Sequence, residues 1–205
     1  MEVELVAYTQ DAERLIAQIA VVCTGRKMPE NYGRLLNDLY DSGHMSVFEH
    51  VSFTFHINGI SRACSHQLVR FRIASFTQKS QRYTIGSDYV LPNLGEMQDK
   101  AQDYLDHGTK LYQEMLLQGI PAEDARFILP NATSTELYMT MNARELIHAC
   151  ELRLCGKAQW EIRELFLRIV DTIPYKHLTD FMAPKCRRLG YCNEKQSCGY
   201  HSSKN

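Results

Sequence analysis

Apolar residues recur every three or four positions near the start of the chain, first over residues 15–22 and again over residues 35–40. This spacing places them on one face of an α-helix, so two amphipathic helices are predicted. The first helix follows Asp11, and Gly43 ends the second, as glycine often does at a helix C-terminus.

The period changes at Val51, where apolar and polar residues alternate as far as Ile57. Such alternation predicts a half-buried β-strand, and Asn58-Gly59 is expected to end it. The following segments are predicted, in order, as a helix from Ser61 toward Arg70, a polar loop at residues 75–83, and a short strand at residues 89–91.

Helical patterns dominate the second half of the chain. Residues 97–118 predict a long amphipathic helix that Gly119 ends. Thr133 and Glu136 have the spacing of a capping box, which predicts a helix over residues 133–154, and a further helix is expected over residues 158–173. Strands are in the minority and do not alternate regularly with helices, so the fold class is predicted as α+β.

Composition is that of an ordinary soluble domain. The 205 residues include 23 Lys and Arg against 24 Asp and Glu, a formal charge of −1, and 44% are hydrophobic. These values exclude a globally basic nucleic-acid coat and a disordered chain. The sequence shows no apolar run long enough for a membrane span and no signal peptide, so we expect a cytoplasmic protein without membrane contacts.

The chain is predicted as one domain over residues 1–185 and a cysteine-containing tail over residues 186–205. The tail cysteines, Cys186, Cys192 and Cys198, are separated by gaps of five residues. Zinc hooks usually have gaps of two or four, so no metal is predicted and the tail is expected to be mobile or to contact another subunit. The cysteines inside helix-like patterns are expected to be reduced and buried; they are Cys23, Cys64, Cys150 and Cys155.

The charges are unevenly spread, because residues 50–87 contain no carboxylate. The cations in this segment are Arg62, Arg70, Arg72, Lys79 and Arg82. A guanidinium that is buried without a partner is costly, so these groups must face water, distant carboxylates or an anionic ligand. The composition leaves two readings open, a solvated basic face and a site for phosphates.

The order of residues 66–84, HQLVRFRIASFTQKSQRYT, resembles the signature of the flavin-dependent thymidylate synthases, the ThyX-type family. That signature is written RHR-x7-S, and here Arg70-Phe71-Arg72 is followed after seven residues by Ser80. Other stretches resemble the same family in the same order: GHMSVFEH at 43–50, DARFILP at 124–130, NARELIHACELRL at 142–154 and KAQWEIR at 157–163.

Three positions depart from the family pattern. Phe71 stands where histidine is usual, Thr77 where asparagine is common, and Gln78 where glutamate is common. If the side chain at position 71 normally touches the flavin, that contact is lost here or passes to the backbone.

The resemblance implies an antiparallel-rich central sheet packed with long helices. It also implies conversion of dUMP to thymidylate, with methylenetetrahydrofolate giving the carbon, FAD mediating the reduction and NADPH supplying electrons. The sequence contains no Gly-x-Gly and no P-loop, so neither FAD nor NADPH is expected to bind through a Rossmann fingerprint. Family members are homotetramers whose active sites draw on several subunits.

Matching positions imply the residues that bind dUMP. Arg153 is expected to act on the uracil ring as a fixed positive charge, because arginine cannot serve as a base at neutral pH. Ser80 is interpreted as a phosphate ligand rather than a nucleophile. The implied set is Gln67, Leu68, Val69, Arg70, Gln78, Lys79, Ser80, Gln81, Arg82, Arg126 and Arg153.

Matching positions also imply the FAD site. Arg144 and His148 have i,i+4 spacing, and Asn142 and Arg153 would lie on nearly the same face of one helix. His44 is expected near the flavin and folate, and Trp160 is predicted to lie in the core. The implied FAD set is Ser46, Arg70, Phe71, Arg72, Gln78, Asn142, Ala143, Arg144 and His148.

Two other functions stay open. Phe71, Phe76 and Tyr83 are interleaved with the cations, a pattern that also suits a non-catalytic RNA-binding module. A third reading is a flavin- and nucleotide-binding relative that has lost activity through Phe71.

Overall fold

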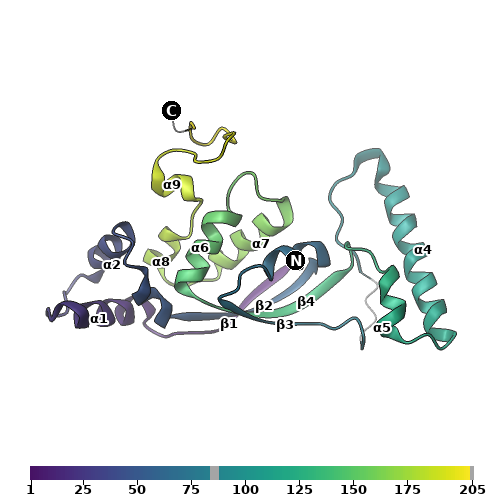
Figure 1. Cartoon of the computed structure of the whole chain (residues 1–205), viewed down its shortest axis with the longest axis horizontal. Helices are drawn as coiled ribbons and strands as arrows, with labels where there is room; N and C mark the ends of the chain where they lie inside the picture. Colours follow the sequence, from purple (N-terminus) through teal and green to yellow (C-terminus); the bar gives the residue numbers. More distant parts are fainter. Residues whose placement is uncertain (84–87, 204–205) are drawn as a thin grey trace.

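A four-stranded antiparallel sheet forms the centre of the molecule, in a computed structural model that describes residues 1–83 and 88–203. The strand order is β1-β2-β4-β3, so β2 and β4 lie inside the sheet and β1 and β3 at its edges (Figure 1). The strands are β1 (Glu2–Tyr8), β2 (Ser52–Ser61), β3 (Ala74–Gln78) and β4 (Ser134–Asn142).

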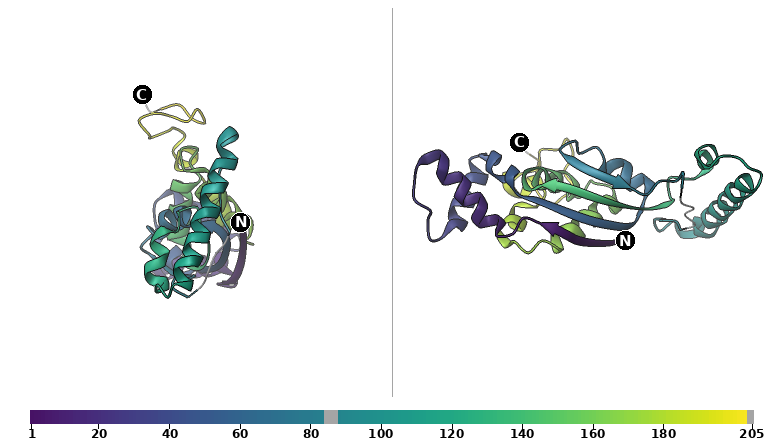
Figure 2. Two further views of the ribbon diagram at one scale, coloured as in Figure 1. Left: turned by 90° about the vertical axis from the view of Figure 1, so that its right-hand side faces the viewer. Right: turned by 90° about the horizontal axis from the view of Figure 1, so that it is seen from below.

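Helices cover one face of this sheet, as Figure 1 and the right-hand view of Figure 2 show. Every second residue of β2 and β4 points into the core beneath them, including Phe53, Phe55 and Met139, none of which is exposed. The opposite face is more polar and carries the Thr54–Thr140 hydrogen bond. The covering helices are α3 (Arg62–Leu68), α6 (Ala143–Arg153), α7 (Trp160–Asp171) and α8 (Lys176–Phe181).

The remaining helices lie at the two ends of the sheet (Figure 1). At one end are α1 (Ala12–Thr24), α2 (Tyr32–Asp41) and the 3₁₀ helix η1 (Met45–His50). At the other end an arm projects away from the sheet, formed by η2 (Gly95–Met97), α4 (Gln98–Leu117), α5 (Ala122–Ala125) and η3 (Arg126–Ile128).

The predicted helices at residues 15–22, 35–40, 97–118 and 158–173 correspond to α1, α2, α4 and α7. The helix predicted over residues 133–154 is wrong in its first half, which is the central strand β4. The hydroxyl of Thr133 donates to the carbonyl of Pro130, so it caps no helix, and the true cap of α6 is Asn142, whose side chain accepts from the amide of Glu145. Residues 134–142 pair with β2 and β3, and every second one of them is buried. These tertiary contacts outweigh the local capping signal.

Other local predictions also fail at the sheet. Gly59 does not end β2; its positive φ of 73° accompanies a bulge through which the strand continues to Ser61. The polar loop expected at residues 75–83 begins as edge strand β3, and β1 was not predicted. Of the short strand at residues 89–91, only a bridge from Tyr89 to Thr133 forms.

Two packing predictions are wrong as well. Trp160 was expected in the core but is 40% exposed at the start of α7. Cys23 was expected to be buried but is exposed on α1, and Cys155 is partly buried, whereas Cys64 and Cys150 are buried as predicted.

The C-terminal segment follows the short helix α9 (Lys185–Leu189) and rises above α6 in Figure 1. Its described part, up to residue 203, is held by a bridge between Cys192 and Ser203. Burial raises the pKa of the Cys186 thiol, and the nearby thiols of Cys155, Cys192 and Cys198 raise it further. Among the described residues, no helix has both the length and the apolar character to cross a membrane.

Candidate active site

The segment that joins α3 to β3 carries residues 67–72, the first half of the signature. Its placement begins at Ser61, whose hydroxyl caps α3 by accepting from the amide of Cys64 at 2.9 Å. The carboxylate of Glu161, only 2% exposed, accepts hydrogen bonds from both the amide and the hydroxyl of Ser61, each at 2.6 Å. Glu161 therefore fixes the start of α3 from α7. Sequence reasoning gave it no role, although it lies in the KAQWEIR motif.

Arg153, the last residue of α6, reaches across this segment. Its Cζ atom lies 5.2 Å from the ring centroid of Phe71, and its Nη2 donates to the carbonyl of Gln67 at 3.4 Å. Its Nε is buried and has no hydrogen-bond partner among the described residues. A buried donor of this kind is costly unless something accepts from it, so the geometry suits an acceptor supplied by a ligand.

Phe71 is a core residue, only 6% exposed. Its ring packs edge-on against Phe166, with centroids 6.0 Å apart, and against His148 at 6.4 Å. The side chain of Phe71, which replaces the usual histidine of the motif, thus points into the protein and packs against Arg153. Leu68 is also fully buried, so neither side chain is exposed to a ligand.

A cavity of about 460 Å³ opens beside this cluster, between η1, α6 and the link to β3. Arg144, His148 and Ile73 line it, together with Gly43 and Met45, the neighbours of His44. Arg144 is held by an ion pair with Glu49 of η1. Of the nine residues in the implied FAD set, only Arg144 and His148 line this cavity. His44 and Ser46 are exposed and lie beside the lining residues Gly43 and Met45 in sequence. Ile73, which is 61% exposed, was not among the predicted site residues, because a lone apolar residue after Arg72 carries no chemical signal in the sequence.

A second group in this cavity was also missed. The Nε of Arg188, from α9, donates to Glu151 at 3.1 Å, and the guanidinium lies 5.7 Å from the ring centroid of Tyr40. Burial raises the pKa of Tyr40 to about 12, and the charge of Glu151 adds to the shift. No signal in the sequence links α2, α6 and the tail, which only the fold brings together.

The second half of the signature lies at the opposite end of β3. The side-chain amide of Gln78 donates to Thr135 at 3.2 Å, and the amide of Lys79 donates to the carbonyl of Glu136. Lys79 and Gln81 line a small cavity of about 80 Å³ at this end. The hydroxyl of Ser80 accepts from the amide of Arg82 at 3.2 Å. Within one chain, residues 78–82 are therefore separated by a strand from the group around Arg153.

Arg82 and Arg126 both contact Glu123 on the arm. Arg82 forms an ion pair with Glu123 at 2.8 Å, and the Nε of Arg126 donates to the carbonyl of Glu123 at 3.1 Å. Desolvation, together with the charge of Arg126, lowers the pKa of Arg62. Arg82 and Arg126 thus share Glu123: Arg82 contacts its carboxylate and Arg126 its backbone carbonyl.

The counter-charges of the carboxylate-free segment come from elsewhere in the chain, as expected. Lys79 lies 4.0 Å from Glu136 and Arg82 pairs with Glu123. Arg70 and Arg72 are exposed, and neither forms an ion pair with a described residue. These two arginines, on the link beside Phe71, are available to an anionic ligand.

Comparison with known proteins decides the family. The profile of a family described as "Thymidylate synthase complementing protein" matches residues 4–176. The flavin-dependent thymidylate synthase of Pyrococcus abyssi is 44% identical over 170 residues, an alignment that covers 75% of this chain and 70% of the relative. The chain belongs to the flavin-dependent thymidylate synthase family.

Other flavin-dependent thymidylate synthases support this membership. The enzyme of Geobacter sulfurreducens is 41% identical over 220 residues, covering 97% of this chain and 94% of the relative. A crystal structure of ThyX from Helicobacter pylori, complexed with FAD and dUMP, superposes with a TM-score of 0.75 at 25% identity and covers 88% of this chain and 98% of that one. The predicted α+β, ThyX-like fold is confirmed, and so is the resemblance found in the motifs.

Proposed function

We propose that this protein makes thymidylate from dUMP, taking the methylene carbon of methylenetetrahydrofolate, with FAD as cofactor and NADPH as the source of electrons. Family membership over residues 4–176 supports the activity. The observation in this structure that carries it is Arg153, which is held between Phe71 and Gln67 with a buried Nε that lacks an acceptor.

The residues of the cavity beside α6 fit FAD. Arg144 and His148 offer donors along one side and Ile73 offers an apolar surface. Arg70 and Arg72 are exposed and offer charges for its phosphates. When bound, FAD supplies the redox chemistry of the reaction. Gln78 lies at the far end of β3 in the same chain, so it would serve a flavin held by another subunit.

Arg153 would act on the substrate. A fixed guanidinium against the uracil ring stabilises the pyrimidine ionised at N3, in which C5 is electron-rich enough to attack the activated methylene carbon. The positive charge persists at all pH values in the physiological range, so this residue orients and stabilises without exchanging a proton. Its position is preorganised by the Phe71 ring and the Gln67 carbonyl.

The remaining implied dUMP residues would bind the phosphate and ribose from the other end of β3. A five-residue strand spans roughly 17 Å, too far for one nucleotide to touch Arg153 and the phosphate ligands near Ser80 within one chain. A shared site removes this difficulty, because residues 78–82 of one subunit can meet Arg153 of another. We therefore propose a homotetramer with active sites built from several subunits.

The arm supports this assembly. It stands apart from the sheet in Figure 1, and it packs through α4 mainly on α5, η2 and η3. Large apolar side chains on it are uncovered: Phe127 is 83% exposed, Leu117 is 87% and Tyr104 is 72%. Apolar area of this kind is typical of a surface that another subunit covers.

One set of measurements separates the three readings. The purified protein should be yellow, and it should oxidise NADPH while forming thymidylate from dUMP and methylenetetrahydrofolate. A yellow protein without turnover would identify an inactive relative. A colourless protein that binds single-stranded RNA, with a log–log salt slope of about −0.7 for each neutralised phosphate, would identify an RNA-binding module. The proposed cytoplasmic location is tested separately by cell fractionation.

A further inference from the structure

Four of the seven cysteines line one cavity of about 650 Å³ next to the tail. They come from three parts of the chain: Cys155 follows the end of α6, Cys186 lies in α9 at the start of the tail, and Cys192 and Cys198 lie farther along the tail. The sequence grouped only the last three, whose spacing does not resemble a zinc hook. The fold adds Cys155, which lies far away in sequence and supplies a fourth sulfur.

The tail touches the α6 end directly. A side chain at Gly156 would have its Cβ 3.1 Å from the sulfur of Cys198, so the absence of one lets the tail approach. Cys192 is 6% exposed, and its amide donates to the carbonyl of Ser202 at 2.8 Å. The tail therefore folds back on itself and onto α6, although residues 190–203 form no helix and only an isolated bridge.

Such a segment has too few apolar residues to bury a core of its own. Small units of this composition are usually held by disulfides or by a structural metal ion. We propose that Cys155, Cys186, Cys192 and Cys198 bind one zinc ion as four thiolate ligands, and that this ion fastens the tail to the end of α6. Four thiolates around a tetrahedral Zn²⁺ form a closed structural site.

The charge around the cavity suits this ion. A zinc ion with four thiolates carries two net negative charges. Four cations, Arg153, Lys157, Arg163 and Lys185, line the same cavity against two carboxylates, Glu151 and Glu194. The lining is therefore positive by two charges, which matches the two negative charges of the zinc ion with its four thiolates.

Binding would require the sulfurs to close on the ion. Within residues 1–83 and 88–203, no three His, Cys, Asp or Glu side chains already stand in metal-binding geometry. The tail can supply the movement, because its described backbone makes few hydrogen bonds with the rest of the chain. Zn–S bonds of about 2.3 Å would draw the four sulfurs together.

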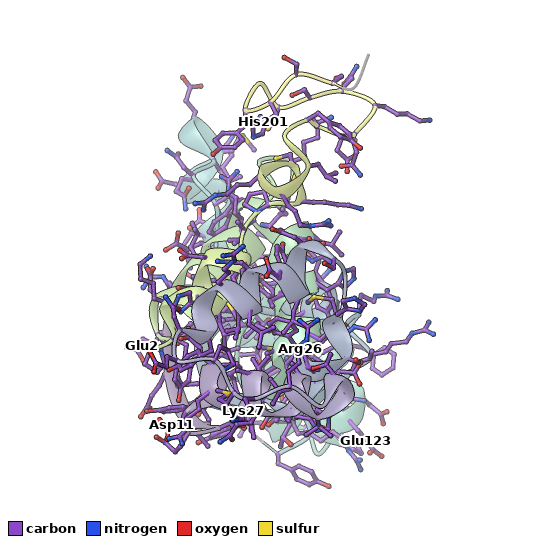
Figure 3. The ribbon with its side chains drawn as sticks, turned by 90° about the vertical axis from the view of Figure 1, so that its left-hand side faces the viewer. Glu2, Asp11, Arg26, Lys27, Glu123 and His201 are labelled. Atoms are coloured by element: carbon purple, nitrogen blue, oxygen red, sulfur yellow. The ribbon has the colours of Figure 1, made fainter. Side chains whose placement is uncertain are left out.

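This site is separate from the nucleotide residues on the arm. Figure 3 shows His201 on the tail at one extreme of the molecule and Glu123 at the other, and Figure 1 places the tail and α5 at different ends as well. Zinc binding would influence the active site through the end of α6, because Arg153 precedes Cys155 by two residues and lines the same cavity.

The test measures zinc in the full-length protein, purified without chelators and again after reconstitution with Zn²⁺. We expect about one zinc per chain in the wild type. Cys198→Ser should lose most of it, and this cysteine is exposed, so the fold should survive. Cys186→Ser provides a second ligand variant. Cys23→Ser is the matched control, since Cys23 is exposed on α1, away from the cavity, and should keep its zinc.

Three results would overturn the proposal: no zinc after reconstitution, zinc that Cys198→Ser and Cys186→Ser both retain, or a disulfide between two of the four cysteines in protein purified under reducing conditions. Circular dichroism confirms that each variant is folded. Flavin absorbance, measured in the same samples, reports on the proposed enzymatic function independently of the metal.

Discussion

The guanidinium of Arg153 lies over the ring of Phe71, with 5.2 Å between its Cζ atom and the ring centroid. Phe71 occupies the position at which the family motif has histidine. The residue that departs from the motif therefore supports Arg153, the proposed catalytic residue. A cation held over an aromatic face is fixed in direction and partly desolvated, and both effects strengthen its field at a neighbouring substrate. The departure is thus compatible with activity.

Arg153→Ala should lower kcat for thymidylate formation by about 10²- to 10³-fold, the usual effect of removing one preorganised electrostatic group. FAD should stay partly bound, because Arg144 and His148 are unchanged. Arg168→Ala is the matched control: Arg168 is an exposed arginine of α7 that pairs with Glu164. Product formation by Arg153→Ala at the wild-type rate would refute the role assigned to this residue.

Phe71→Leu should keep the fold, since a buried apolar residue replaces another of similar size. It removes the aromatic face, and a partly desolvated cation–π contact contributes about 1–2 kcal/mol, so kcat should fall roughly 5- to 30-fold. Thermal unfolding and steady-state kinetics, measured together, separate the two effects. A loss of stability with unchanged kcat would show that Phe71 only fills the core.

Mixing two inactive variants tests the shared site. If Arg153 and Arg82 of one active site belong to different subunits, refolded mixtures of Arg153→Ala and Arg82→Ala chains should regain about a quarter of wild-type activity by random assembly. Each variant refolded alone serves as the control. Failure of the mixture to exceed the separate variants would place both arginines of a site in one chain.

Glu161→Ala should destabilise the protein by about 2–5 kcal/mol, because the amide and hydroxyl of Ser61 both lose a buried charged acceptor. The matched change is Glu164→Ala, an exposed glutamate on the same helix. Urea unfolding of the two variants measures the difference. Equal unfolding midpoints would mean that the contact between α7 and the start of α3 is dispensable.

The raised pKa of Tyr40 predicts a stability loss in alkali. Its folded-state pKa of about 12 exceeds its usual value of 10. The contribution is therefore complete below pH 10 and disappears as the pH rises through 12. Because the ring is only half buried, the effect should be about 1 kcal/mol. The wild type should lose this much more stability over that range than Tyr40→Phe; Tyr104→Phe, at an exposed tyrosine, should behave like the wild type.

The motif residues were readable from the sequence because their order along the chain is itself the signal. The amphipathic helices α1, α2, α4 and α7 were readable too, since their apolar periodicity is local. The secondary-structure predictions that failed concern strands, whose formation depends on pairing with segments far away in the sequence. Thr133 and Glu136 form a locally sound capping pattern, yet residues 134–142 become strand β4 because they pair with β2 on one side and β3 on the other. Edge strands β1 and β3 likewise depend on partners far along the chain.

The order of residues along the chain was enough to identify the family and the cationic segment without carboxylates. Three relationships became visible only in the folded chain: Phe71 packs in the core beneath Arg153, Glu161 fixes Ser61, and residues 78–82 lie a strand away from Arg153. The tertiary structure also decided that Cys155 joins the tail cysteines around one cavity. The physical reason is that side-chain contacts depend on distances in space, whereas local patterning specifies only the period and the ends of each element.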